Sequence, residues 1–235
     1  MATRQLIVNA DDFGLSPGVN AGVVRAHEGG IVTSASLMVR APAAADAAAY
    51  ARDRPALSVG LHVDLGEWVF EAGAWAPAYV VVPAEDATAV GEELRRQLNR
   101  FGQLMGQSPT HLDSHQHVHL REPVTSAMVE LATRLHVPLR SFSSSVRFCG
   151  DFYGQTGTGE PWPDGISPES LIALLERLPP GVTELSCHAG TGDDLDSVYG
   201  VERTLEVEVL CDPSVRAAIE AEQIVLRSFR EVSWT

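Results

Sequence analysis

The stretch Thr110–Leu120 reads THLDSHQHVHL, and it holds four of the eight histidines of the chain. Side chains of an extended segment alternate between two faces, so one side of a strand here would carry Asp113, His115, His117 and His119. Histidine is the commonest metal ligand, and its ordinary pKa lies close to neutral. We therefore expect a metal site or a proton-transfer site where this strand ends. The alternative is a polar loop with surface histidines, and the spacing does not identify which histidine binds.

Outward from this stretch, short apolar runs alternate with helix-forming segments. The strands that we expect span residues 5–9, 35–39, 57–61, 110–113, 137–140, 182–187 and 224–229. Two helix starts are clear, because Ser16 and Ser167 are each followed by a proline at the first helical position. A repeated βα pattern predicts a parallel sheet with right-handed crossovers. With about seven strands, we expect an α/β fold in which residues 1–235 form a single (β/α) barrel domain.

Two connections are longer than an ordinary loop. Residues 67–86 carry Trp68, Trp75 and Tyr79 without a clear period, and residues 141–165 are rich in glycine and serine. Long connections are commonly lids or binding loops, which is what we expect here. The aromatic side chains of the first could stack on the faces of sugar rings. They could equally cover the inside of a loop that folds on itself.

Composition limits the partners and the compartment. The formal net charge is −14, which argues against binding to nucleic acids or to anionic membranes. Cys149, Cys187 and Cys211 are odd in number and far apart, so we expect no disulfide framework and a reducing compartment. The apolar run at residues 5–9 is too short for a signal peptide or a membrane span. We therefore expect a cytoplasmic protein that acts on a small molecule.

Acidic residues and histidines stand directly after several predicted strands. Asp11 and Asp12 follow the first strand, His62 follows the third, and His188 follows a late one. The carboxyl ends of barrel strands meet on one face, where active sites lie. Each residue alone has an ordinary explanation, such as a helix cap for the acidic pair or a buried histidine bonded to the backbone. Their shared position favours one common site.

The residue types at this face suit metal-assisted hydrolysis. Two imidazoles and one carboxylate make a three-ligand site with an open position, and Asp12, His62 and His115 could supply it. Zinc suits nitrogen-rich sites and magnesium prefers oxygen, so ligand type favours zinc. A bound metal polarises a carbonyl and acidifies water. Asp11 could accept the water proton, and His188 could give a proton to a leaving group.

At these residues the chain resembles the YdjC-like carbohydrate deacetylases, a family that includes the chitooligosaccharide deacetylases. The matching segments are LIVNADDFGLSPGVNAGV, GIVTSASLMV, VGLHVDL, PTHLDSHQHVHL and ELSCHAG, with a weaker match at RTLEVEVLCDPSVRAAI. They span nearly the whole chain in order. The resemblance implies a distorted TIM-like barrel that removes acetyl groups from N-acetylated sugars with a metal ion, often as a homodimer.

Carried over position by position, the resemblance implies metal ligands at Asp12, His62 and His115, a base at Asp11 and an acid at His188. The family is usually assigned magnesium, which differs from the preference argued from ligand type, so both metals stay open.

At other positions the resemblance does not assign a role. The family's proline after the late histidine is replaced by Ala189, which leaves the geometry of that loop and the substrate open. We place Asp113, His117 and His119 in the second layer around the metal or in the substrate cleft.

Two other classes of function compete with a sugar deacetylase. Phosphoesterases and cyclic-amide hydrolases also use HxH pairs, but usually directly after the first strand, where this chain has NADDFG. A phosphoesterase should also carry basic residues at its site, whereas this chain has 17 Lys and Arg against 31 Asp and Glu. A non-catalytic metal-binding or sugar-binding module would need neither a base nor an acid.

Overall fold

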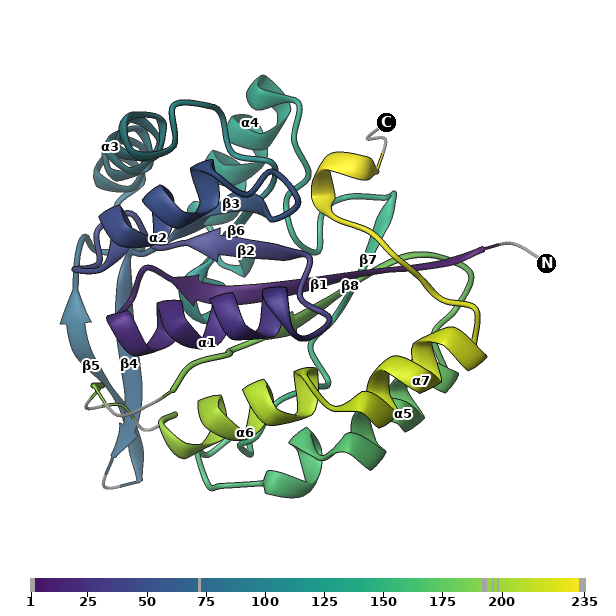
Figure 1. Cartoon of the computed structure of the whole chain (residues 1–235). Helices are drawn as coiled ribbons and strands as arrows, with labels where there is room; N and C mark the ends of the chain where they lie inside the picture. Colours follow the sequence, from purple (N-terminus) through teal and green to yellow (C-terminus); the bar gives the residue numbers. More distant parts are fainter. Residues whose placement is uncertain (1–2, 72, 192–193, 196, 198, 233–235) are drawn as a thin grey trace.

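A computed structural model describes residues 3–71, 73–191, 194–195, 197 and 199–232. Its centre is a seven-stranded parallel sheet, in which β6, β3, β2, β1, β8 and β7 follow one another and β9 pairs with β1 (Figure 1). The strands of this sheet are β1 (Arg4–Phe13), β2 (Ser34–Leu37), β3 (Ser58–Val63), β6 (Leu112–Ser114), β7 (Val146–Cys149), β8 (Gly181–Cys187) and β9 (Val225–Leu226).

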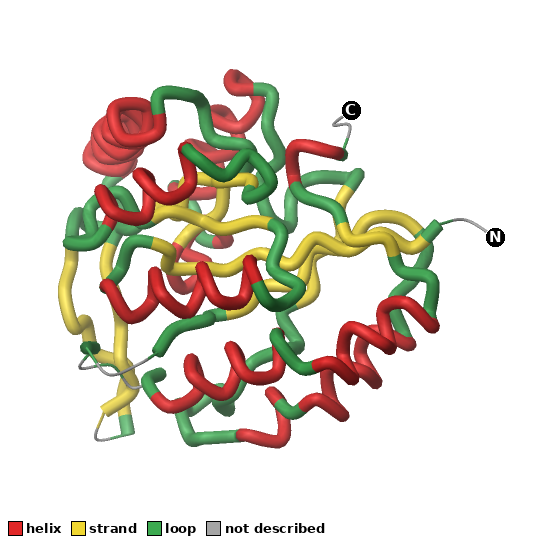
Figure 2. Tube along the Cα trace, in the orientation of Figure 1, coloured by secondary structure: helices red, strands yellow, loops and turns green. Residues whose placement is uncertain are grey.

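Helices surround the sheet, so that strands lie inside and helices outside (Figure 2). Their apolar faces supply a core with β1, whose residues from Leu6 to Phe13 are all buried. Near-continuous apolar strands are what a parallel sheet covered by helices requires. The α-helices are α1 (Pro17–Glu28), α2 (Ala44–Arg52), α3 (Ala87–Met105), α4 (Val124–Leu135), α5 (Pro168–Glu176), α6 (Val201–Leu210) and α7 (Pro213–Ala221). Short 3₁₀ turns are η1 (His115–Leu120), η2 (Pro163–Ile166) and η3 (Phe229–Glu231).

The sheet curls without closing into a complete barrel. Its two outer strands are β6 and β7, and no ladder joins them among the described residues. An isolated bridge between Leu112 and Leu139 continues the sheet one step beyond β6. The predicted distorted (β/α) barrel is therefore confirmed, with an opening between β6 and β7.

The two long connections differ from our expectation. Residues 67–86 contain an antiparallel hairpin, β4 (Gly66–Glu71) and β5 (Ala74–Val80), instead of an irregular loop. Proline at position 77 and a register shift between Glu67 and Trp68 obscure the period-2 pattern. The strand predicted at 137–140 is reduced to the bridge at Leu139, and the paired strand is β7, inside the predicted loop 141–165.

The histidine-rich stretch is not extended throughout, so the predicted shared face is wrong. Strand β6 stops at Ser114, and Gln116 and His117 have φ of 48° and 52°. This left-handed backbone turns the chain sharply, so the alternation of a strand does not apply beyond Ser114. His115 and His117 line the site cavity, whereas His119 is turned into the protein.

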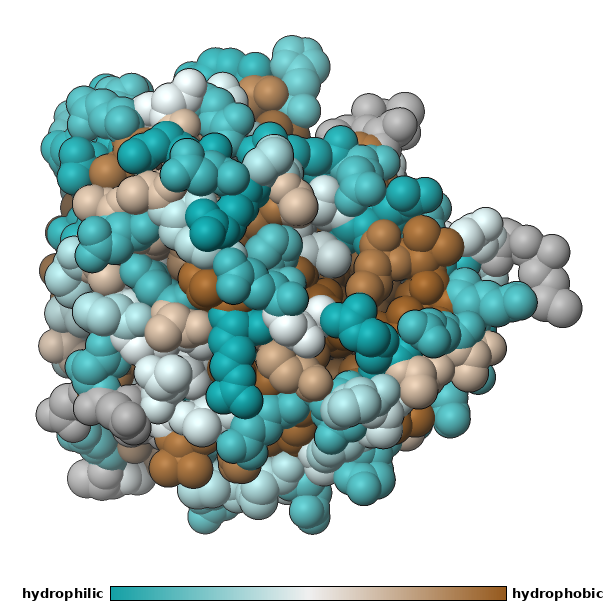
Figure 3. All heavy atoms as spheres, in the orientation of Figure 1, coloured by the Kyte–Doolittle hydropathy of each residue, from teal (hydrophilic) through white to brown (hydrophobic). Residues whose placement is uncertain are grey.

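The surface is mainly hydrophilic on the face drawn in Figure 3. No helix of the described part of the chain is long and apolar enough to cross a membrane.

Candidate active site

A bulge at the end of β1 aims two consecutive carboxylates at one cavity. In a regular strand Asp11 and Asp12 would point to opposite faces. Here the register with β2 shifts between Ala10 and Phe13, and Asp12 has φ of 63°. Aspartate tolerates this conformation better than most residues. Both side chains therefore line the same cavity of about 490 Å³.

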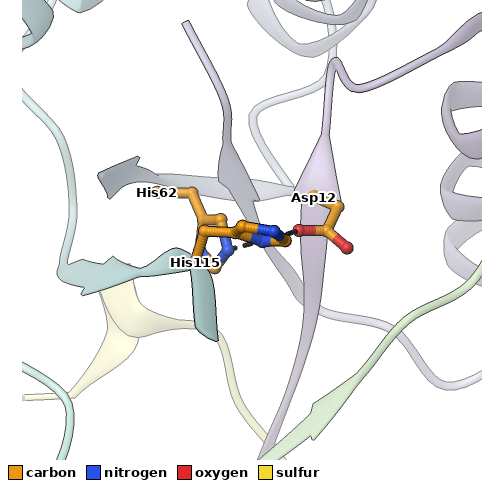
Figure 4. A group of neighbouring side chains, drawn as sticks. All are labelled: Asp12, His62 and His115. Atoms are coloured by element: carbon orange, nitrogen blue, oxygen red, sulfur yellow. Dashed lines mark hydrogen bonds and ion pairs between the residues drawn. The ribbon is translucent and has the colours of Figure 1, made fainter. Parts of the chain in front are cut away.

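Asp12 and two histidines form a compact group at the strand ends (Figure 4). The Oδ1 atom of Asp12 lies 3.3 Å from His62 Nε2 and 3.0 Å from His115 Nδ1. One ligand atom from each residue lies within 4.8 Å of those of the other two. Such a group of one carboxylate and two imidazoles could hold a divalent metal ion.

The second nitrogen of each imidazole supports this interpretation. His62 Nδ1 lies 2.8 Å from Asp113 Oδ1, so that carboxylate fixes the ring and leaves Nε2 facing Asp12. Metal-binding histidines typically have such a carboxylate partner. His115 Nε2 is buried and has no hydrogen-bond partner among the described residues. Burial alone would lower the pKa of His62, but Asp113 raises it to about 10.

Arg140 binds three buried carboxylates behind the cavity. Its Nη1 and Nη2 atoms each lie 2.7 Å from an oxygen of Asp11. The same guanidinium lies 2.9 Å from Asp113 and 2.7 Å from Glu184. Burial would raise the pKa of Asp11, but Arg140 holds it below its ordinary value. Asp11 is therefore an ionised carboxylate in a fixed orientation.

A second arginine binds the other carboxylate of the pair. Arg203, from the first turn of α6, lies 2.6 Å from Asp12 Oδ2. Burial would raise the pKa of Asp12, but Arg203 and His115 hold it well below its ordinary value. Asp12 thus offers Oδ1 to the histidines while Arg203 occupies Oδ2.

His188 follows β8 and lines the same cavity. The rings of Tyr153 and Tyr199 both lie 5.4 Å from its ring. Glu206 accepts a hydrogen bond from the backbone N–H of His188 and another from the Tyr199 hydroxyl. Its Oε1 lies 3.9 Å from the His188 Nδ1 atom, which is buried and has no hydrogen-bond partner among the described residues. Burial lowers the pKa of His188 to about 4, so the resting imidazole is neutral.

The remaining predicted residues lie at different depths. Asp113 is fully buried behind His62, between that ring and Arg140. His117 lines the cavity. His119 is buried 2.6 Å from the Ser114 hydroxyl, outside the cavity lining. The structure therefore brings six of the predicted residues around one cavity, which are Asp11, Asp12, His62, His115, His117 and His188.

Sequence reasoning missed both arginines and Glu206. Arg140 ends the strand predicted at 137–140, so the rule that singled out aspartates and histidines after strands would also have found it. Arg203 and Glu206 lie on α6, where i and i+3 residues share a face. That pattern is common on exposed helices, so it carried no specific signal.

Comparison with known proteins agrees with this geometry. The sequence profile described as YdjC-like protein matches residues 5–221. A carbohydrate deacetylase from Geobacillus stearothermophilus is 35% identical over 249 residues, with 97% of this chain and 98% of that protein covered. A chitooligosaccharide deacetylase from Serratia marcescens is 33% identical, with 97% and 99% covered.

Solved structures share the fold. A protein from Enterococcus faecalis, described as a candidate cellobiose-phosphate cleavage protein, superposes with a TM-score of 0.79 at 27% identity, covering 97% of this chain and 98% of that one. A family 4 carbohydrate esterase from Streptomyces lividans superposes with a TM-score of 0.58 at 10% identity, covering 100% and 98%. At that identity the second likeness concerns the fold alone. The profile match and the curated relatives together establish that this chain belongs to the YdjC-like protein family.

Proposed function

We propose that this protein is a metal-dependent deacetylase that hydrolyses the acetamide group of an N-acetylated sugar, such as a chito-oligosaccharide. The observation that carries the proposal is the position of Asp11 and His188 in one cavity with the group Asp12, His62 and His115. The relatives from Geobacillus stearothermophilus and Serratia marcescens, a carbohydrate deacetylase and a chitooligosaccharide deacetylase, supply the substrate class.

In this proposal Asp12, His62 and His115 hold the metal. When bound, the ion would supply a Lewis acid for the acetyl carbonyl and for water. Asp113 keeps the His62 ring oriented, and Arg203 keeps Asp12 ionised. The two imidazoles favour zinc on ligand type, while the family resemblance favours magnesium. Elemental analysis of the purified protein and reconstitution with each ion distinguish them.

Asp11 acts as the general base. Arg140 holds its two oxygens in place and keeps them unprotonated, so Asp11 is ready to accept a proton from the attacking water. His188 acts as the acid on the leaving nitrogen. Because its resting imidazole is neutral, it first takes a proton from solvent water at the cavity and then delivers it to the leaving nitrogen, while Asp11 returns its proton to solvent. Breaking an amide needs this step, since an amine anion is too basic to leave.

The competing phosphoesterase or other amidohydrolase has weaker support. The two buried arginines at the site, Arg140 and Arg203, are already paired with carboxylates, which leaves Arg121 in the cavity lining as the cationic group for a phosphate. The direct test measures acetate released from N-acetylglucosamine oligomers and phosphate released from generic phosphoesters. Acetate release alone supports the proposal, and phosphate release alone overturns it.

The variant Asp11→Asn tests whether Asp11 is the general base or a metal ligand. The variant keeps the shape of the side chain but removes the proton acceptor, so we expect metal content to persist while turnover falls by ~10²–10⁴. If the variant instead loses its metal in proportion to its activity, Asp11 is a ligand and the two aspartates have exchanged roles.

We also propose a cytoplasmic location and a homodimer. The three cysteines are free in the structure, which suits a reducing compartment. The homodimer rests on the family resemblance, and sedimentation of the purified protein tests it.

A further inference from the structure

The β4–β5 hairpin carries an aromatic face at the rim of the cavity. Cross-strand pairing sets Phe70 opposite Trp75 and Trp68 opposite Pro77. Directly paired side chains lie on the same face of a hairpin. The rings of Phe70 and Trp75 pack edge to face with their centres 5.5 Å apart. Trp68 and Trp75 both line the cavity, while 58% of Trp75 remains exposed.

The hairpin is fastened to the same turn that carries His115. The side chain of Gln116 accepts a hydrogen bond from the Trp68 N–H at 2.8 Å and donates one to the Trp68 carbonyl at 2.7 Å. At the base of the hairpin, Tyr79 donates a hydrogen bond to Asp64 at 3.1 Å. Figure 1 shows the hairpin standing across the carboxyl ends of the central strands. The aromatic face is therefore held at a set position relative to His115.

We propose that Trp75 is the stacking platform for a second sugar ring, next to the ring whose acetamide is cleaved. This inference rests on the proposed function and names a residue that selects the substrate. Asp11, Asp12 and His188 line the cavity as buried or half-buried side chains, whereas Trp75 lines it with 58% of its surface exposed. A pyranose has apolar C–H faces that match an aromatic ring, with hydroxyl groups at its edge for water. The cavity of about 490 Å³ lies in the range that holds drug-sized ligands.

The variant Trp75→Ala tests the platform by comparing a substrate of two sugar rings with a substrate of one ring. We expect the ratio of kcat/KM for the N-acetylglucosamine disaccharide to kcat/KM for the monosaccharide to fall roughly 3- to 10-fold, the size of one aromatic contact. For the disaccharide, the loss of kcat/KM should appear as a higher KM with little change in kcat. Stacking on Trp75 stabilises the bound ground state and the transition state equally. Trp75→Tyr should restore part of the ratio.

Trp162→Ala is the matched control. Trp162 is 49% exposed and is absent from the cavity lining, so its loss should leave the ratio unchanged. Gln116→Ala should lower the ratio with Trp75 intact, since it releases the hairpin from its anchor. If Trp75→Ala leaves the ratio intact, or changes both substrates by the same factor, the proposal is overturned.

A binding measurement separates this inference from the proposed function. Calorimetric titration with the fully deacetylated disaccharide needs no turnover, and we expect affinity to fall in Trp75→Ala and persist in Trp162→Ala. This result would support the platform even if the wild type released no acetate. Equal affinities would overturn it whatever the activity. If Trp75→Ala instead changes the sedimentation coefficient and leaves sugar affinity intact, the aromatic face is a protein interface.

Discussion

At the scale of single residues, His188 allows two steps of amide cleavage to be separated. We expect His188→Ala to bind metal normally and to be nearly inactive on acetamido sugars. It should recover disproportionately on an acetylated phenol, because that leaving group departs without a proton. The measurement is the ratio of amide to ester turnover in wild type and variant. Equal losses on both substrates would make His188 a structural or positioning residue, and a lower melting temperature would identify the structural case.

His111 is expected to make the protein sensitive to acid. It is buried beside Ser36, stacked on Phe229, and burial lowers its pKa to about 3. In the unfolded chain its pKa is about 6.5. The unfolded state therefore binds the extra proton between these values, so stability falls as pH drops from about 6.5 toward 3.

His111→Gln removes this proton uptake. Between pH 6 and 4, we expect the free energy of unfolding to fall less steeply than in wild type, by up to about 1.4 kcal/mol per pH unit. Chemical denaturation at several pH values measures the slope. His136→Asn is the control, because His136 is exposed and asparagine tolerates its left-handed backbone. Parallel slopes for wild type and His111→Gln would contradict the assignment.

At the scale of elements, α1 packs directly on the loop that carries His188. A Cβ atom at Gly22 would lie 2.3 Å from the Cα atom of Gly190. Gly22→Ala should therefore push the two elements apart and lower the free energy of unfolding by about 1–3 kcal/mol, with lower turnover. Gly91→Ala, in α3, meets nothing within 4 Å and should stabilise by about 0.5–1 kcal/mol. Unfolding curves of both variants make the comparison, and equal effects would contradict it.

Elements with a strong local signal were predictable from sequence, and elements set by long-range pairing were not. Helix α1 begins at the expected Ser16 cap and α5 at the expected Ser167 cap, because a helix cap is a local signal. Strand β7 consists of four residues that gain their conformation from pairing with β8. The same division holds in the site. Asp12, His62 and His115 follow predicted strands, whereas the contact of Arg203 with Asp12 joins residues 191 positions apart.

At the scale of the whole molecule, the site concentrates negative charge in a chain that is already acidic. Asp11, Asp12, Asp113 and Glu184 are all buried, with Arg140 and Arg203 as their arginine partners. A bound divalent cation would offset part of this charge. Because such an ion binds the folded state, saturating metal at 100 times Kd should add about 2.7 kcal/mol of stability.

That gain corresponds to a melting temperature higher by roughly 5–10 °C for a chain of this size. Thermal unfolding with added zinc or magnesium, and then with a chelator, measures the shift. Asp12→Asn should abolish most of it. An equal shift in Asp12→Asn would place the ion elsewhere.

The pairing of β1 with β8 has a consequence for the order of folding. Residues Arg4 to Ala10 pair with residues Gly181 to Cys187, so the two central strands are separated by most of the chain. Ladders between such distant segments form slowly, because a long loop must close before any contact compensates for it. On the ribosome, Asp11 and Asp12 emerge early but meet His188 and Arg203 only late in synthesis. We expect nascent chains to gain metal affinity and protease resistance together, after β8 has left the exit tunnel.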